Sequence, residues 1–342
     1  MSKASISSQA PIANRASISS KAIPLSNYLP NVSTIAYGCM GLGGGWNSNP
    51  TSKADIKQAN DIIELALESG INLFDHADIY TFTKAEQAFG SVLKQTPSLR
   101  DNMFIQSKCG IRFEGEGNVG RYDFSSDWVS QSVDSILQRL NTEKLDVLLL
   151  HRPDPLMDLE ELAITLQSIH KQGKVDFFGV SNMNSHQIQF LQSALELPIV
   201  ANQMEMSLAK LDWLNEGVMV NTEGYRQSDF PAGTIEHCRM NGVQLQAWGC
   251  LAQGRFSESG HHSEHENVRK TAHYVTLLAD QYGVTSEAIV LAFLLRHPAN
   301  IQPIIGTTNL DRIKASSLAT EVKLSREEWY NLYVYSRGQA LP

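Results

Sequence analysis

Short apolar runs alternate along the chain with longer segments that carry apolar residues at helical spacing. One run, at residues 145–150, has five apolar residues in six and ends at His151, ahead of Pro153 and Pro155. Such a run is typical of a strand buried on both faces of a parallel sheet. Its length argues against a helix, and Pro153 prevents an easy continuation. Seven similar runs lie at residues 35–38, 71–74, 103–107, 177–180, 198–201, 243–248 and 303–306.

The segments between these runs predict helices. Ser52 and Asp55 have the spacing of a capping box, and the helix that they open ends at Gly70. Residues 207–230 look irregular. Further helices are expected at about 84–94, 127–140, 158–172, 184–195, 232–241, 266–282, 286–297, 309–318 and 325–335.

Eight strand-then-helix units in this order predict an α/β protein with parallel crossovers. They close most naturally into a (β/α)8 TIM barrel, here with additional helices before the last strand and at the C-terminus. A doubly wound open sheet is the alternative, but that fold favours a GxGxxG fingerprint after its first strand. Residues 41–46 read GLGGGW instead, so a flexible glycine loop is at least as good an interpretation as a phosphate site.

Composition narrows the class of protein. The chain has 342 residues, 42% of them hydrophobic, and a net charge of -8, which gives no reason to expect a nucleic-acid surface. No apolar run reaches 18 residues, so no membrane span is expected. Cys39, Cys109, Cys238 and Cys250 are scattered without a CxxC pair, as in a reduced cytoplasmic protein.

The first 27 residues differ from the rest of the chain. They hold eight serines and no acidic residue. A single arginine is weak support for an organelle transit peptide, and no apolar segment suggests a secretory signal. We therefore expect residues 1–27 to be a disordered serine-rich tail, followed by a single domain over residues 28–342.

The first charged or strongly polar residue after each of strands two to six would lie at the same open end of a barrel. Tyr80 follows the first of these residues, Asp75, by five positions. A lysine ammonium beside a phenol favours the phenolate and lowers its pKa, and a carboxylate holds the lysine in place. A histidine opposite could orient a carbonyl, so the group could act as a general acid. These strand-end residues are Asp75, Lys108, His151, Ser181 and Asn202.

Two other interpretations stay open for these residues. Asp75, His76, Asp78 and His151 could be metal ligands, although the lysine and the tyrosine would then have no role. His151 alone could simply be hydrogen-bonded in the rim of the core. We expect no metal.

Four motifs in order resemble the aldo-keto reductases. They are FDHADIY at residues 74–80, SKCG at 107–110, LLLHRPDP at 148–155 and GVSN at 179–182. The strings HADIY, SKCGI and LHRPDPLMD look most like the bacterial YdhF-type oxidoreductases. The resemblance covers residues 33–335, and the four motifs together are specific where each alone is weak.

The resemblance implies a barrel enzyme that uses NADPH to reduce aldehydes or ketones to alcohols. Tyr80 would donate the proton, Lys108 and Asp75 would lower its pKa, and His151 would orient the carbonyl. Trp46 would lie in the loops that form the substrate pocket. The residues implied to contact the cofactor are Ser181, Asn182, Gln203, Trp248, Gly249, Cys250, Leu251, Gln253, Gly254, Arg255, Gly306, Thr307, Thr308 and Arg312.

Each cofactor assignment has a structural alternative. Ser181 and Asn182 could cap the next helix, Trp248 could be a core aromatic, and Arg312 could be a solvated surface charge. Many family members carry lysine at the position of Gly306, so the grip on a 2′-phosphate would depend on Arg312. They also carry glutamate and asparagine at the positions of Ala315 and Ser316, so the resemblance implies weaker contacts to the adenine here.

A second function is a cofactor-binding regulatory subunit, as in potassium-channel β subunits. An interface would then lie between Asn202 and Glu236, around Trp213 and Leu214. We expect the enzyme instead, as a monomer or dimer.

Overall fold

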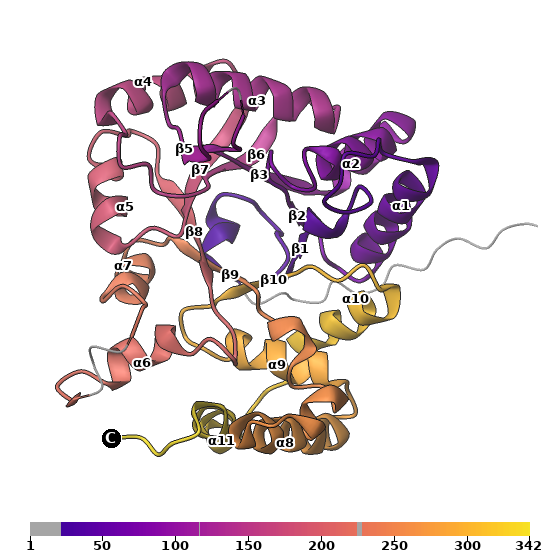
Figure 1. Ribbon diagram of the computed structural model, residues 1–342, viewed down its shortest axis with the longest axis vertical. Helices are drawn as coiled ribbons and strands as arrows, with labels where there is room; N and C mark the ends of the chain where they lie inside the picture. The colour runs from indigo at the N-terminus through magenta and orange to yellow at the C-terminus, as the bar shows by residue number, and fades with distance from the viewer. Residues whose placement is uncertain (1–21, 116, 224–227) are drawn as a thin grey trace, which may run out of the picture.

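A closed parallel barrel forms the centre of the computed structural model, which describes residues 22–115, 117–223 and 228–342 (Figure 1). The strands follow one another around the barrel in the order β1-β10-β9-β8-β7-β6-β3-β2, so that the first and last close it. The strands are β1 (Ala36–Gly38), β2 (Leu73–Asp75), β3 (Phe104–Cys109), β6 (Leu145–Leu150), β7 (Val175–Ser181), β8 (Ile199–Glu205), β9 (Gln244–Trp248) and β10 (Gln302–Ile305). The predicted (β/α)8 fold is confirmed.

Helices surround the barrel and cover the outer faces of its strands (Figure 1). They are α1 (Lys53–Glu68), α2 (Lys84–Gln95), α3 (Ser126–Leu140), α4 (Leu159–Lys171), α5 (Ser185–Gln192), α6 (Asp212–Val218), α7 (Thr234–Met240), α8 (Glu266–Tyr282), α9 (Ser286–Leu295), α10 (Leu310–Ser317) and α11 (Arg326–Arg337). The additional helices α8 and α11 pack side by side, as Figure 1 shows. The capping box at Ser52 and Asp55 opens α1 as predicted.

Among the elements that were not predicted are helix α6 and a short antiparallel strand pair. Helix α6 lies within residues 207–230, which look irregular in sequence, and it is only seven residues long. An antiparallel pair, β4 (Ile111–Arg112) with β5 (Arg121–Tyr122), interrupts the connection after β3. Neither element is long enough to show a clear period in the sequence.

The predicted boundary of the N-terminal tail is wrong. Residues Pro24–Asn27 form a 3-10 helix, and Leu25 is fully buried. The backbone nitrogen of Leu25 donates to Oε1 of Gln244, the first residue of β9, so this segment closes the amino-terminal end of the barrel. Residues 1–21 lie outside the described part of the chain.

Register decides which side chains meet inside the barrel. Every residue of β6 is buried, as expected for a strand covered on both faces. Asp75 is level with Gln106, and Gln246 is level with both Gln203 and Gln302. Polar side chains from five strands are therefore brought to one interior layer.

In the described ranges, no single helix is long and apolar enough to cross a membrane. Helices α8 and α9 together are long and apolar, but the chain bends by 95° between them.

Candidate active site

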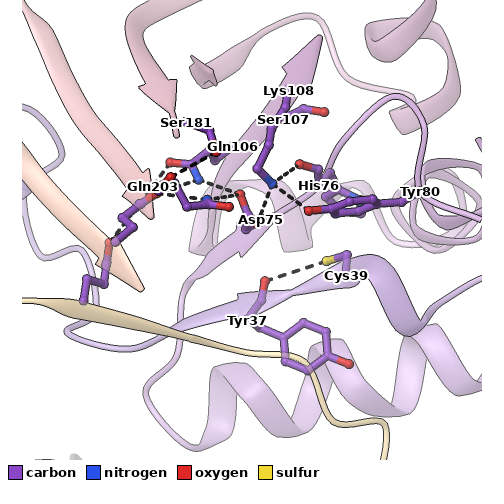
Figure 2. Close-up of polar contacts among 12 residues, drawn as sticks. Tyr37, Cys39, Asp75, His76, Tyr80, Gln106, Ser107, Lys108, Ser181 and Gln203 are labelled. Carbon is purple, nitrogen blue, oxygen red and sulfur yellow. Dashed lines mark hydrogen bonds and ion pairs between the residues drawn. The ribbon is translucent and has the colours of Figure 1, made fainter. Parts of the chain in front are cut away.

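Lys108 is the centre of a buried polar group at the carboxyl ends of β2 and β3. Its Nζ lies 2.7 Å from Oδ2 of Asp75, 3.0 Å from the hydroxyl of Tyr80 and 2.8 Å from the carbonyl oxygen of His76 (Figure 2). The three donor positions of the ammonium are thus all used. Lys108 and Asp75 are 0% and 2% exposed, so this ion pair is shielded from water.

The backbone after β2 turns sharply to place Tyr80 over Lys108. Asp75 ends the strand, and the three consecutive residues Thr81, Phe82 and Thr83 then take positive φ angles of 47°, 56° and 73°. Non-glycine residues seldom adopt this conformation, which costs about 1 kcal/mol or more at each position. The Thr81 hydroxyl bonds to the Leu42 carbonyl oxygen at 2.9 Å and so ties this turn to the loop after β1.

Burial dominates the acid–base balance of the group. Burial alone lowers the pKa of Lys108, but Asp75 and the Tyr80 hydroxyl together raise it above its ordinary value. Burial raises the pKa of Tyr80, and the opposing effect of the ammonium is smaller. Lys108 lowers the pKa of Tyr80 as predicted, but burial outweighs this effect, and the Asp75 carboxylate, expected to help lower the pKa, contributes to the rise instead. Tyr80 holds its proton at neutral pH.

His151 faces Tyr80 from the end of β6. The two rings are 6.2 Å apart between centroids and meet edge to face. Burial, with the charges of Lys108 and Arg152, lowers the pKa of His151 to about 2, so the imidazole is neutral. Its buried Nδ1 has no hydrogen-bond partner among the described residues. A neutral imidazole with one N–H is a suitable donor to a carbonyl oxygen.

The side chains expected at the nicotinamide end converge at the ends of β7, β8 and β9. The Ser181 hydroxyl and the Asn182 backbone nitrogen both donate to the carbonyl oxygen of Gln203, at 3.0 and 2.9 Å. Asn182 has a φ of 56°, and its Oδ1 accepts from the indole nitrogen of Trp248 at 3.3 Å. Gln203 donates through Nε2 to Asp75 Oδ1 at 3.1 Å and thereby joins this cluster to Lys108.

The loop after β9 forms a tight, left-handed turn. Gly249, Ala252, Gln253 and Gly254 have φ angles between 49° and 77°, and Ala252–Gly254 form a 3-10 turn. The thiol of Cys250 is buried and donates to the carbonyl oxygen of Ile304 at 3.1 Å, which leaves only its backbone for a ligand. The neighbours Leu251 and Arg255 belong to the same turn.

The segment after β10 leads into α10. Asn309 caps this helix by accepting from the Arg312 backbone nitrogen at 3.1 Å, and Thr307 accepts from the Asn309 backbone nitrogen. The Arg312 side chain is 57% exposed, and its Nε lies 3.5 Å from a Glu287 carboxylate oxygen. Gly306 and Thr308 lie between β10 and this cap. Arg312 is therefore exposed, but a carboxylate already shares its charge.

The glycine run after β1 has a packing role. Gly43, Gly44 and Gly45 all have φ near 80°. A Cβ added at Gly43 would lie 2.5 Å from the Lys84 backbone, so the loop rests against the start of α2. This loop carries Trp46.

Sequence reasoning missed two sets of residues. Gln106 and Gln246 lie within strands, where nothing local distinguishes them from core positions. Phe82 and Phe113 form an aromatic cluster with Trp46: the ring centroids are 5.3 Å apart for Trp46 and Phe82 and 5.4 Å apart for Phe82 and Phe113. The three side chains are 49%, 46% and 46% exposed, on loops after β1, β2 and β3.

The structure bears on two alternative roles, a metal site and a partner interface. His76 is buried with its ring edge-on to Phe89, and no group of three or more His, Cys, Asp or Glu in the described ranges could hold a metal ion. Trp213 and Leu214, around which the alternative of a regulatory subunit would place a partner interface, are buried, so these two side chains offer little surface to a partner.

Fold and site together define the class: a (β/α)8 barrel whose carboxyl-end mouth carries acid–base side chains. The chain belongs to the aldo/keto reductase family, whose model matches residues 34–333, and the protein is an oxidoreductase of that family. The family resemblance of its motifs is confirmed.

Curated relatives and solved structures agree with this assignment. Oxidoreductase YdhF of Escherichia coli (strain K12) is 34% identical over 84% of this chain and 90% of its own. A 6-dehydroglucose reductase of Agrobacterium fabrum is 33% identical over 93% of this chain and 98% of its own. A crystal structure of an aldo/keto reductase from Klebsiella pneumoniae with NADP and acetate has a TM-score of 0.65 at 21% identity, over 88% of this chain and 90% of that one. This last likeness supports the fold.

Proposed function

We propose that this protein reduces aldehydes or ketones to alcohols with NADPH, and that Tyr80 is the proton donor. The observation that supports this proposal most directly is the Lys108 ammonium, which contacts Asp75 and the Tyr80 hydroxyl while His151 faces the same phenol. A phenol that retains its proton at neutral pH, beside a fixed cation, is suited to protonate an oxygen as negative charge develops on it.

The residues at the ends of β7 to β9 fit a nicotinamide. The amide nitrogen of Gln203 donates to Asp75 and Gln246, which leaves the amide oxygen as the polar atom of this side chain for a ligand. This oxygen could accept from a carboxamide, and Ser181 and Asn182 lie beside it. Trp248 supplies an aromatic face, and the left-handed turn at 249–255 offers backbone nitrogens to a pyrophosphate. Thr307, Thr308 and Arg312 would take the adenosine end, and a complex of a structural neighbour contains NADP.

In the proposed reaction the cofactor would supply the hydride, and side chains of this protein would orient the carbonyl and supply the proton. When bound, NADPH supplies a hydride to the carbonyl carbon. His151 donates a hydrogen bond to the carbonyl oxygen and orients it. Tyr80 transfers its proton to that oxygen, which completes the alcohol, and Lys108 stabilises the phenolate that remains until solvent returns the proton. Asp75 keeps Lys108 in position throughout.

The substrate would enter beside the exposed aromatic cluster of Trp46, Phe82 and Phe113. These rings lie on the same face of the barrel as Tyr80, and Phe82 follows it by two residues. Aromatic and apolar groups next to the carbonyl would find a partner there. We further expect a cytoplasmic monomer or dimer.

The decisive experiment compares the parent protein with Tyr80→Phe. NADPH oxidation is followed with a panel of aromatic aldehydes, short aliphatic aldehydes, ketones and sugar carbonyl compounds, the last because relatives are 6-dehydroglucose reductases. Turnover should fall about a hundredfold or more, the usual scale for loss of a general acid, while NADPH binding stays within about twofold. Tyr333→Phe is the matched control, because the Tyr333 hydroxyl bonds to Asn215 and not to Lys108 or Asp75. Near-parent turnover by Tyr80→Phe would refute the mechanism.

A further inference from the structure

Glutamine side chains occupy a part of the barrel interior that branched apolar residues usually fill. Gln106 on β3, Gln203 on β8, Gln246 on β9 and Gln302 on β10 are each at most 2% exposed. A buried amide without partners is costly, so such a layer is tolerated only when its hydrogen bonds are satisfied.

The four amides form one continuous hydrogen-bonded chain that ends on Asp75. Nε2 of Gln106 donates to Asp75 Oδ1 at 2.6 Å and to Gln246 Oε1 at 2.9 Å. Nε2 of Gln246 donates to Oε1 of Gln106 at 3.1 Å and to Oε1 of Gln302 at 3.0 Å. Gln203 donates to the same two acceptors as Gln106. Figure 2 shows Gln106 and Gln203 directed at Asp75 from opposite strands.

The far end of the chain determines its direction. Nε2 of Gln302 donates to the Ser33 carbonyl oxygen at 2.6 Å, and a carbonyl can only accept. With Nε2 of Gln302 turned to Ser33, Oε1 of Gln302 accepts from Gln246, and the N–H groups of Gln246 go to Gln302 and Gln106. The oxygen of Gln246 is left to accept, which turns the N–H groups of Gln106 and Gln203 towards Asp75. Both oxygens of the carboxylate are then assigned: Oδ1 to the amides and Oδ2 to Lys108.

We propose that Gln106, Gln246 and Gln302 are positioning residues for carbonyl reduction: an oriented amide chain, anchored at the Ser33 carbonyl, that fixes the Asp75 carboxylate so that one oxygen serves Lys108. None of the three touches Tyr80. They act through Asp75, and Gln203 belongs to the same chain through its amide nitrogen. The catalytic part of this proposal rests on the proposed function.

The charges around Tyr80 determine the sign of the effect. Lys108 on β3 favours the phenolate, whereas Asp75 on β2 disfavours it; His151 after β6 is neutral, and so is Cys39 in the turn after β1, because burial raises the pKa of its thiol. Two amide N–H groups on Asp75 disperse its negative charge. If they are lost, the undispersed carboxylate disfavours the phenolate more strongly, and Tyr80 becomes a poorer acid.

The test compares Gln246→Leu with Gln244→Leu. Gln244 lies two residues earlier on β9 and is equally buried, but its amide contacts Leu25, Leu245 and Asn300 and not the chain. Two quantities are measured in each full-length variant: the carboxyl carbon NMR signal of Asp75, assigned with Asp75→Asn, and the pH profile of kcat with an aldehyde that the parent reduces. Gln302→Met, which removes only the distal anchor, replaces Gln246→Leu if the latter does not fold.

Gln246→Leu should move the Asp75 signal, lower kcat about tenfold at neutral pH and shift its upper apparent pKa upward by about one unit. Gln244→Leu should leave both the signal and the profile unchanged, even if it lowers stability. An unmoved Asp75 signal in Gln246→Leu, or equal changes in both variants, overturns the proposal. If the parent reduces no carbonyl, the proposed function fails, and the NMR comparison still decides whether the amides hold Asp75.

Discussion

Replacing Lys108 by methionine tests two separate effects of the buried ion pair, one on the stability of the fold and one on carbonyl reduction. Methionine is close in shape to the lysine stem, so packing changes little. The substitution leaves the Asp75 carboxylate, which is 2% exposed, without the cation 2.7 Å away. Removing one partner of a buried ion pair typically costs about 3–5 kcal/mol. Two amide N–H groups still reach Oδ1 of Asp75, at 2.6 and 3.1 Å, so we expect a loss near the lower end, about 3 kcal/mol.

The double variant Lys108→Met with Asp75→Asn should recover most of this loss. Asparagine removes the buried charge and keeps an oxygen that accepts from Gln106 and Gln203, so its stability should lie within about 1–2 kcal/mol of the parent. Neither variant should reduce carbonyls at more than about a hundredth of the parent rate, because the cation that assists Tyr80 is gone.

Urea unfolding followed by circular dichroism measures the stability of the three proteins, with NADPH oxidation as the activity assay. The cofactor is left out of the unfolding experiments, since a ligand that binds only the folded state adds apparent stability. A single variant as stable as the parent, or a double variant no more stable than the single one, would refute the reasoning. The first result would mean that the carboxylate is not effectively desolvated.

Three further predictions concern other parts of the site. Burial, with the nearby Glu86, raises the pKa of Asp78 to about 8; the unfolded chain loses this proton near pH 4, so stability falls as pH rises from about 4 to 8. Asp78→Asn should remove that decline and add about 2 kcal/mol or more at pH 8, as read from thermal melts at several pH values. Phe82→Gly should change the free energy of unfolding by less than about 1 kcal/mol, because glycine relieves the left-handed backbone and so offsets the lost ring contacts. The same variant should raise KM for aromatic aldehydes more than for short aliphatic ones. A uniform rise would place Phe82 outside the substrate site. Arg312→Ala should raise KM for NADPH about tenfold and leave KM for NADH nearly unchanged, since only NADPH has a 2′-phosphate; Glu287→Gln, which frees the guanidinium, should act in the opposite direction. Equal effects on both cofactors would show that Arg312 has only a structural role.

The local pattern of the chain is enough to determine the order of its elements. Apolar runs and helical periods depend only on near neighbours, so the strands around 145–150 and 243–248 and the capping box at Ser52 are predicted within a few residues. Parallel strands present their carboxyl ends to one face, and for this reason the residues that follow them, such as Asp75 and His151, can be grouped by their positions in the chain. The family motifs add proposed roles to these residues.

Tertiary structure decides what depends on register and burial. Gln106 and Gln246 sit 140 residues apart, and only the closure of the barrel brings their amides into a pair. The effect of Lys108 on the pKa of Tyr80 was predicted, but the net direction was not, because desolvation depends on everything packed around the phenol, whereas the sequence shows only the charges that could be near it. Trp213 could have been a surface anchor or a core residue, and the packing of α6 decides for the core. Periodicity is a property of neighbours in the chain; desolvation and hydrogen-bond direction are properties of neighbours in space.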